Sequence, residues 1–563
     1  MKSCTRSLLL AAVPALVCAC ASESPKATSV RFANQPVVTR VADRENVAKL
    51  PVVRAFYDVF YQLEGSFYQR VVRALDVPRP QRALGVNAID EVPNSTWFTN
   101  RNTVRKLAPE EIVAGPARSG NPEDFTPWTI ISTKTGGVSP GFLVRDTRGM
   151  KYIVKFDKKG EGEAESATSV IVNRLLWAAG LNVPEDYVVE INMHDLIVAR
   201  DSKVRDAIGE QPMQRRDFEA VAAQLEVAPD GHMRGLASKL VEGRPLGGHP
   251  GSGVRTDDPN DVIPHELRRD LRGLYALFAW LDHTDLKESN TLDVYARDPQ
   301  DPSRHYVVHY HIDFGRALGT MASSTRDPRR GYQYAFDPQA SVSALLSAGT
   351  VQRPWEGRVR TPLPGLGLYE AYAFDPGSWH PYTASYVPML TADRIDNYWG
   401  TKLVMSFTPD QLRAAISAGR LSDPVAAEYL LQQMIARQRM TGAYWFARVN
   451  PLDRFTVRSY GNAVGLCFED LMLTNHLVES AANTRYAMVT ASRVDSEIST
   501  PFSIRARSDG RSCTGPLTTA NDGDGYTIVK LTTRGRGEPL STHVHLARDP
   551  ADGQYRVIGV YRR

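Results

Sequence analysis

The chain contains the segment His283-Thr284-Asp285-Leu286-Lys287-Glu288-Ser289-Asn290, and Asp313-Phe314-Gly315 follows further along. Asp285 has the position of a carboxylate that faces an attacking hydroxyl group, and Asn290 can reach back to a metal ion on phosphate groups. Asp313, on a separate loop, would bridge the same metal. We therefore expect Asp285 and Lys287 to be catalytic, and Asn290 and Asp313 to be metal ligands. The competing interpretation is a solvated loop that carries a few acidic residues.

Two strands are expected between these motifs. Residues 291–295 and 304–312 are rich in β-branched and aromatic side chains, and a polar, proline-containing loop at 297–302 separates them. The pattern predicts a long hairpin that joins the loop of Asp285 to the loop of Asp313.

A glycine-bearing loop and a lysine lie in the first half of the chain. Gly136, Gly137 and Gly141 occur just before a predicted strand, and the next strand, residues 151–156, carries Lys155 near its end. A charge at the end of an apolar run needs a partner. We expect the glycines to cover phosphate groups and Lys155 to bind them. A strand-end surface lysine is the alternative, and glycine turns alone are a weak signal.

A helix is predicted after Lys155, because Ile171, Leu175 and Ala178 have helical spacing and Gly180 suits its C-terminus. A glutamate at its start could hold Lys155 by an ion pair, and Glu165 is the preferred candidate. Glu163 is nearly as suitable. Either could instead be a solvated first-turn glutamate that the helix dipole favours. A second helix is expected over residues 262–282, leading into the loop of Asp285.

These pieces together resemble the atypical bacterial kinases of the HipA type and the wider kinase-like superfamily that includes the aminoglycoside phosphotransferases. The matching segments lie within residues 128–320 and read S-P-G-F, I-V-K-F, A-A-G-L-N-V-P, H-T-D-L-K-E-S-N and I-D-F-G. The resemblance implies an α+β, bilobal kinase-like core that uses ATP and Mg²⁺ or Mn²⁺. It also implies that backbone groups between Lys239 and Glu242 contact the purine, although residues 234–243 could equally be an ordinary core strand.

The sequence departs from ordinary protein kinases in three ways. Thr284 replaces the usual loop arginine, no A-P-E segment follows Asp313-Phe314-Gly315, and the spacing from Lys155 to Glu165 is short. These departures put regulation by activation-loop phosphorylation and a protein substrate in doubt.

The N-terminus resembles that of a bacterial lipoprotein. Lys2 and Arg6 precede an apolar run at residues 8–17 that is too short to span a bilayer, and Val17-Cys18-Ala19-Cys20 resembles a lipobox. We expect a signal peptide over residues 1–20, lipidation of Cys20 and a membrane anchor through it. Ala21 is compatible with an outer-membrane or periplasmic location in the cell envelope. A signal cleaved elsewhere and a cytoplasmic chain are the alternatives.

Composition gives weaker indications. Of 563 residues, 67 are basic and 63 acidic, so the net charge of +4 gives no footprint for nucleic acid. Of five cysteines, Cys467 and Cys513 lie outside the N-terminal segment and could form a disulfide in an oxidising compartment. The twelve histidines show no paired zinc spacing.

The expected organisation has five parts, of which the signal peptide at residues 1–20 is the first. Residues 21–95 would be a tether and a helical extension, 96–245 an N-terminal lobe, and 246–455 a C-terminal lobe. Alternating patterns then predict a small β-sandwich at 456–563, which could bind a protein partner.

Three functions remain open from sequence. The first is a membrane-anchored phosphotransferase with an unknown acceptor hydroxyl. The second is a nucleotidyl transferase on the same fold. The third is a non-catalytic module that binds a nucleotide or another ligand. Little ATP is expected in the envelope, which weighs against the first, whereas the set Lys155, Asp285, Asn290 and Asp313 weighs against the third.

Overall fold

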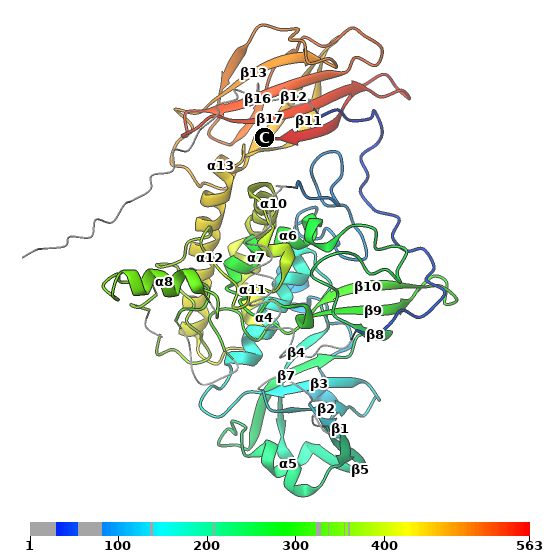
Figure 1. The fold of residues 1–563 in the computed structure, drawn as a ribbon, viewed down its shortest axis with the longest axis vertical. Coiled ribbons are helices and arrows are strands. Elements are labelled where there is room, and N and C mark those ends of the chain that lie inside the picture. The colour runs from blue at the N-terminus through cyan, green and yellow to red at the C-terminus, as the bar shows by residue number, and fades with distance from the viewer. Residues whose placement is uncertain are drawn as a thin grey trace, which may run out of the picture.

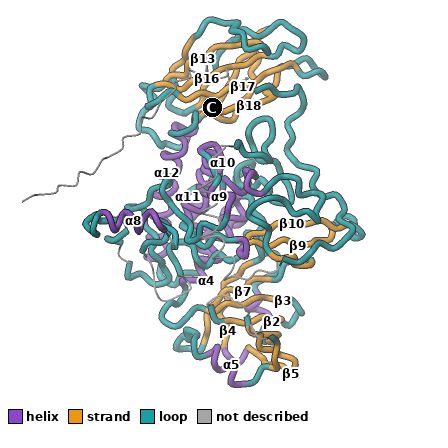
Figure 2. Tube along the Cα trace, viewed as in Figure 1, coloured by secondary structure: helices purple, strands orange, loops and turns teal. Residues whose placement is uncertain are grey.

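The computed structural model describes residues 30–54, 81–134, 139–205, 209–321, 328–335, 337–353, 355–358 and 361–563. Cys20, Gly136, Gly137 and most of the expected helical extension therefore lie outside the described residues. Helices gather in the middle of the molecule and strands mostly at its two ends (Figure 2). No helix in the described ranges has the length and apolar character needed to cross a bilayer.

A seven-stranded sheet forms one end of the molecule (Figure 1). Its strand order is β4 (Asp186–Asn192), β7 (His232–Lys239), β3 (Lys151–Phe156), β2 (Gly141–Arg145), β1 (Trp128–Thr133), β5 (Leu196–Arg205) and β6 (Glu210–Pro212). Neighbouring strands are antiparallel except β1 and β5, which run parallel. Short elements accompany the sheet: α3 (Pro109–Ala114), η2 (Pro122–Phe125), η3 (Met193–Asp195) and α5 (Arg215–Ala222).

The alternation of side chains in β3 gives the sheet two different faces. Tyr152, Val154 and Phe156 are buried in an apolar core together with residues of β1 and β2. Successive side chains of a strand point to opposite faces of the sheet, so Lys155, between Val154 and Phe156, lies on the other face. Helix α4 (Ala164–Ala179) packs on β7 and β4, and nearly all of its residues are buried.

The hairpin predicted between the two motifs is present. Strands β9 (Thr291–Arg297) and β10 (His305–His311) pair antiparallel over their whole length, from Thr291 opposite His311 to Arg297 opposite His305. β8 (Arg244–Gly247) adds a third strand beside β9. The amide of Ile312 donates to the carbonyl oxygen of Asn290 and closes the base of the hairpin.

The middle of the molecule is helical. It contains η4 (His265–Leu267), α6 (Arg269–Arg272), α7 (Leu274–Leu281), η5 (Glu288–Asn290), α8 (Pro338–Leu346), α9 (Val387–Leu390), α10 (Arg394–Met405), α11 (Pro409–Ala418) and α12 (Pro424–Phe446). The single helix expected over 262–282 is wrong, because it is divided into η4, α6 and α7. Gly273 separates α6 from α7, and a Cβ atom there would lie 2.5 Å from Trp399 of α10. Glycine at this position thus allows α10 to pack closely against the junction of α6 and α7.

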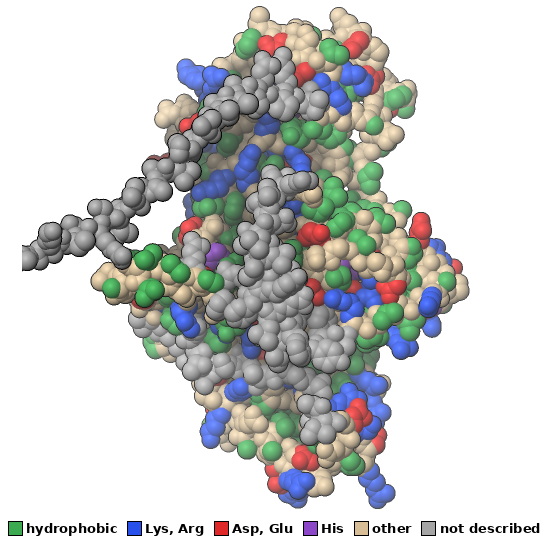
Figure 3. Space-filling model, in the orientation of Figure 1, with side chains coloured by type: hydrophobic (Ala, Val, Ile, Leu, Met, Phe, Trp, Pro, Cys, Tyr) green, Lys and Arg blue, Asp and Glu red, His purple; other side chains and the backbone are tan. Residues whose placement is uncertain are grey.

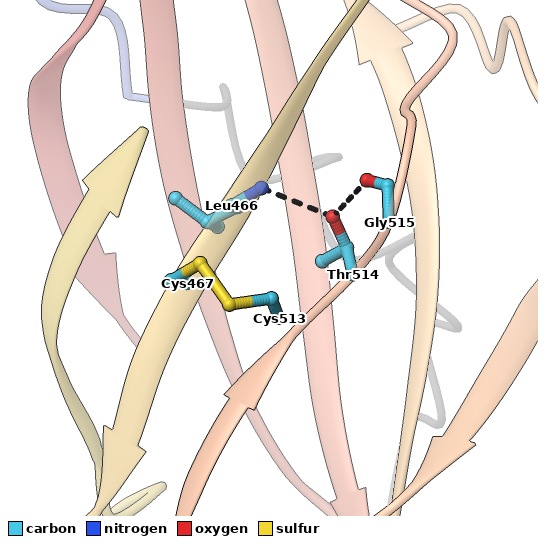
Figure 4. Close-up of a disulfide and its surroundings, with 5 residues drawn as sticks. All are labelled: Leu466, Cys467, Cys513, Thr514 and Gly515. Atoms are coloured by element: carbon cyan, nitrogen blue, oxygen red, sulfur yellow. Dashed lines mark hydrogen bonds between the residues drawn. A yellow bond between two sulfur atoms is a disulfide. The ribbon is translucent and has the colours of Figure 1, made fainter. Parts of the chain in front are cut away.

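Two further sheets form the C-terminal end. One contains β11 (Leu452–Tyr460), β12 (Ala463–Asp470) and β15 (Arg511–Cys513), and the other contains β14 (Phe502–Arg505), β13 (Arg485–Ser492), β16 (Thr527–Arg534), β17 (Leu540–Arg548) and β18 (Tyr555–Arg562). They share one apolar core, and α13 (Leu471–Thr474) follows β12. Cys467 and Cys513 are directly opposite on β12 and β15 and form a disulfide (Figure 4).

The described parts of the expected N-terminal extension are not helical. Residues 30–54 form an extended segment that contacts two distant parts of the protein. The ring of Phe32 packs edge-on against that of His545, and the amide of Val47 donates to the carbonyl oxygen of His305. Residues 81–95 are also without helix. The expected tether is thus bound to the rest of the protein from residue 30 onward, while the boundaries of the five expected parts stay predictions.

Candidate active site

The segment of Asp285 begins where α7 ends. Asp282 adopts a left-handed conformation with φ of 50°, which stops the helix and turns the chain into the loop. His283 is buried edge-on against Phe278 and Phe314, so the loop is packed against the segment of Asp313. Burial lowers the pKa of His283, which makes it a neutral packing residue.

Asn290 and Asp285 are hydrogen-bonded to each other. The side-chain amide of Asn290 donates to the carbonyl oxygen of Asp285 over 2.7 Å and to its carboxylate over 3.2 Å. Because the nitrogen of the amide is used in this way, its oxygen is the atom left to bind a metal ion. Both residues are buried, and the hydrogen bonds fix the loop in the form that the sequence predicts.

Two cations face the Asp285 carboxylate. The guanidinium of Arg316 lies 3.4 Å from its Oδ2, and the ammonium of Lys287 lies 3.9 Å from the same atom. Lys287 is therefore at the predicted site. Arg316 was not among the predicted residues, although its position directly after Asp313-Phe314-Gly315 was a usable signal.

Lys155 and Asp313 meet across the site. The ammonium of Lys155 lies 2.6 Å from Oδ1 of Asp313. Partial desolvation would raise the pKa of Asp313, but Lys155 outweighs that effect and holds the pKa at about 2. Burial would likewise lower the pKa of Lys155, whereas Asp313 and Glu165 raise it. Asp313 has φ of 65°, a left-handed conformation in which aspartate and asparagine are enriched among residues other than glycine.

Glu165 has a different partner from the one expected. Ser139 donates its hydroxyl to the Glu165 carboxylate at 2.7 Å from each oxygen. Among the described carboxylates, Asp313 is the one within ion-pair distance of Lys155, so the expected contact of Lys155 with Glu165 is not formed. Burial raises the pKa of Glu165. Glu163 accepts a hydrogen bond from the amide of Ser422, away from Lys155.

Two glycines allow close approaches at the site. A Cβ atom on Gly141 would lie 1.9 Å from the carbonyl oxygen of Val154, so the residue opposite Lys155 must be glycine for β2 and β3 to pair. A Cβ atom on Gly315 would lie 2.8 Å from Glu165, so this glycine lets the segment of Asp313 touch α4. Gly141 thus supports the strand that carries Lys155.

Lys239 and Glu242 lie at the end of β7. Lys239 forms an ion pair with Glu185 at 3.0 Å and a longer one with Glu242 at 3.7 Å, and it donates to Ser119. Its side chain is thus held by Glu185 and Ser119 at the end of β7. Residues 240–243 connect β7 to β8, which is the position expected for a backbone that contacts a purine.

Lys134 is a further basic residue of the site that the sequence did not single out. Burial lowers its pKa, and Lys155, Asp313 and Glu165 all act on it electrostatically. Lys134, Lys155, Glu165 and Asp313 thus form one group of interacting charges, contributed by four separate segments of the chain.

The residues fit a divalent cation. Mg²⁺ and Mn²⁺ prefer hard oxygen ligands, and the carboxylate of Asp313 with the amide oxygen of Asn290 supplies them. Asp313 has 42% of its side chain exposed, whereas Asp285 has 9%. A metal bound to phosphates can therefore reach Asp313 from solvent, while Asp285 stays packed beside it.

No protein-family model and no curated protein matches the chain. Three solved structures that it resembles are of kinases. One is the Golgi casein kinase with Mn and ADP bound, at a TM-score of 0.29 and 11% identity, with 56% of this chain and 71% of that chain covered. A second structure of the Golgi casein kinase gives a TM-score of 0.30 at 11% identity over 73% of this chain and 94% of that one. The Rio2 kinase–ADP/Mg²⁺–phosphoaspartate complex from Chaetomium thermophilum gives 0.18 at 16% identity over 52% and 73%. None of these matches supports the HipA type or a lipoprotein in particular, and at these TM-scores they carry no functional argument.

Proposed function

We propose that the protein is a phosphotransferase that uses ATP and a divalent metal ion to phosphorylate an acceptor hydroxyl group. One observation carries the proposal: Lys155 from the sheet pairs with Asp313 from a distant loop at 2.6 Å, and Arg316, three residues after Asp313, lies 3.4 Å from the carboxylate of Asp285, which is hydrogen-bonded to Asn290. Residues from both halves of the chain thus converge on one site in the roles that phosphoryl transfer needs.

Each residue has a separate role in this proposal. Asp313 and the amide oxygen of Asn290 would hold Mg²⁺ or Mn²⁺, which neutralises phosphate charge when bound. Asp285 accepts the proton of the acceptor hydroxyl or orients that group. Lys155 binds the phosphates of the nucleotide, and the backbone of residues 240–243 faces the purine.

The cations beside Asp285 support a transfer reaction. Lys287 and Arg316 lie within 4 Å of its carboxylate, so they also flank the position where an acceptor hydroxyl would sit. A phosphoryl group arriving there spreads negative charge over its oxygens, and fixed cations stabilise that charge. A pure binding site would have no need for cations around the acceptor carboxylate.

A nucleotide-binding module without transfer is the second candidate. The observation that favours it is the hydrogen bond of Glu165 to Ser139, because active protein kinases pair this glutamate with the phosphate lysine. Rearrangement of Glu165 toward Lys155 on nucleotide binding would remove this objection.

We propose a lipid-anchored location in the cell envelope, with Cys20 as the modified residue. The disulfide of Cys467 and Cys513 supports an oxidising compartment. The sequence of the first twenty residues remains its main support.

The test is an assay of residues 21–563 with radiolabelled ATP and Mg²⁺ or Mn²⁺, using the chain itself, cell-wall fragments and cell extract as acceptors. Transfer that Asp285→Asn abolishes would support the proposal. Metal-dependent ATP binding without any transfer would replace it with the binding module.

A further inference from the structure

Three side chains that can bind metal lie together at the hairpin, apart from the residues of the active site. His249 follows β8, Asp293 is on β9 and His309 is on β10 directly opposite Asp293. All three are buried, with exposed fractions of 0%, 0% and 3%. Their potential ligand atoms all lie within 4.8 Å of one another.

The distances suit one small ion. Oδ1 of Asp293 lies 2.7 Å from Nδ1 of His309 and 3.6 Å from Nδ1 of His249. A tetrahedral zinc ion with bonds of about 2.0–2.2 Å separates neighbouring ligand atoms by about 3.3 Å, between these two values. Binding of the ion would open the contact between Asp293 and His309 by about 0.6 Å and draw His249 closer to Asp293 by about 0.3 Å.

One potential ligand atom, Nδ1 of His249, forms no hydrogen bond within the described part of the chain. Because this atom is buried, that is a costly arrangement for a ring nitrogen. The other nitrogen, Nε2, lies 2.8 Å from the hydroxyl of Tyr386, which fixes the ring so that Nδ1 points toward Asp293. A metal ion would satisfy that atom.

The surroundings resemble the supporting groups of a metal site. Oδ2 of Asp293 accepts a hydrogen bond from Arg255 at 3.1 Å, which leaves Oδ1 as the ligand atom. Trp97 stacks on the ring of His309 at 3.5 Å and contacts that of His249 edge-on at 4.9 Å. Such contacts orient metal ligands and restrict the site to one geometry.

We propose that His249, Asp293 and His309 bind a divalent transition-metal ion, with Zn²⁺ as the ion that this ligand set favours and a water molecule as the fourth ligand. Two imidazole nitrogens and one carboxylate oxygen are the ligands that zinc takes, whereas Mg²⁺ requires oxygen ligands in octahedral geometry. The site is separate from Asp313 and Asn290 and does not depend on the proposed transfer reaction.

The position of this site indicates how a bound ion would affect the hairpin. Asp293 lies three residues after Asn290, and His309 lies four residues before Asp313. An ion bound to both strands would fix the register of the hairpin next to its base, where Asn290 and Asp313 must meet. The alternative is a hydrogen-bonded cluster of His249, Asp293 and His309 that needs no ion.

The experiment measures metal in the full chain after expression with zinc and exhaustive dialysis, by inductively coupled plasma mass spectrometry. We expect about one zinc ion per chain. His309→Gln and Asp293→Asn should lose it. His305→Gln, a histidine of the same strand that stacks on Tyr295, should retain it, and so should Asp313→Asn.

Spectroscopy keeps the test decisive if a variant fails to fold. Replacement of zinc by Co²⁺ in the unmodified chain should give the intense visible absorption of tetrahedral cobalt with nitrogen and oxygen ligands. A chelator should lower the melting temperature of the unmodified chain. The proposal is overturned if the unmodified chain retains no zinc and gives no such cobalt spectrum. It is also overturned if folded Asp293→Asn and His309→Gln retain full zinc content.

Discussion

The ammonium of Lys155 and the carboxylate of Asp313 neutralise each other at 2.6 Å, although 158 residues separate them in the chain. In the proposed reaction these groups bind different parts of one ligand, the phosphates and the metal ion. A nucleotide alone would bind Lys155 and leave Asp313 unpaired, whereas a metal ion alone would bind Asp313 and leave Lys155 unpaired. Binding of the two together replaces the ion pair without leaving either charge unpaired, so we expect them to bind cooperatively.

The first prediction follows from this coupling. ATP with Mg²⁺ at about one hundred times the dissociation constant should stabilise the protein by about 2.7 kcal/mol and raise the melting temperature by several degrees. ATP with a chelator, or Mg²⁺ alone, should do much less. Differential scanning fluorimetry measures the shifts, and equal shifts with and without metal would contradict the coupling.

The second prediction separates Asp285 from Asp313. Asp313→Ala removes the metal carboxylate, so metal-dependent nucleotide affinity should fall sharply. Asp285→Ala should leave affinity nearly unchanged and lower turnover by on the order of a hundredfold or more. Calorimetric titration and a transfer assay on both variants check this, with Asp298→Ala at the hairpin tip as the control. Identical behaviour of the two site variants would show that the roles are assigned wrongly.

The third prediction concerns acid stability. The pKa of Asp313 is about 2 against an ordinary 3.8, because the effect of Lys155 outweighs that of partial desolvation. The ion pair therefore stabilises the fold fully above pH 3.8, and this stabilisation is lost as the pH falls toward 2. Lys155→Met should be less stable near neutral pH and lose less stability over that acid range. The effect should be modest, since solvent reaches Asp313. Urea unfolding at several pH values measures it, and parallel curves for both proteins would argue against the ion pair.

The fourth prediction concerns the C-terminal sheets. The disulfide closes a loop between residues 46 apart, so breaking it should destabilise this part of the protein by roughly 2–4 kcal/mol. The transition of these sheets should move to lower temperature in Cys467→Ala/Cys513→Ala and in reductant. Nucleotide affinity should not change. Calorimetry with and without reductant tests this, and mass spectrometry of the unreduced chain must find the linked peptides.

The fifth prediction concerns the N-terminus. Cys20→Ser should abolish acyl labelling in cells and leave a larger precursor, whereas Cys18→Ser should label normally. Labelling that persists in Cys20→Ser would assign the anchor to another residue.

The sequence was most informative where function depends on residues close together in the chain. Asp285, Lys287 and Asn290 lie within six positions and meet as expected, and the hairpin after them has the predicted strands. The expected ion pair of Lys155 with Glu165, or with Glu163, is not formed: Lys155 pairs with Asp313, and Glu165 accepts a hydrogen bond from Ser139, a contact between segments that the sequence does not show.

Other features depend on contacts between residues far apart in the chain, which a local sequence pattern cannot predict. The junction of α6 and α7 at Gly273 packs against Trp399, more than a hundred residues away, where a side chain larger than glycine would clash. The histidines gave no zinc pattern, because His249, Asp293 and His309 are far apart in the chain and become neighbours only when β8, β9 and β10 pair.

Basic and acidic side chains are interspersed on the face drawn in Figure 3, in keeping with the balanced composition.

The β9–β10 hairpin also tells where the chain tolerates change. Its tip, residues 299–304, is exposed and far along the strands from Asn290 and Asp313. Lengthening both arms by equal numbers of residues, or inserting a peptide tag at the tip, would leave every cross-strand pair near the base in place. A single residue inserted into one arm would turn its side chains to the opposite face and separate His309 from Asp293. The tip is therefore a suitable place for a fluorescent label that does not touch the loop of Asp285.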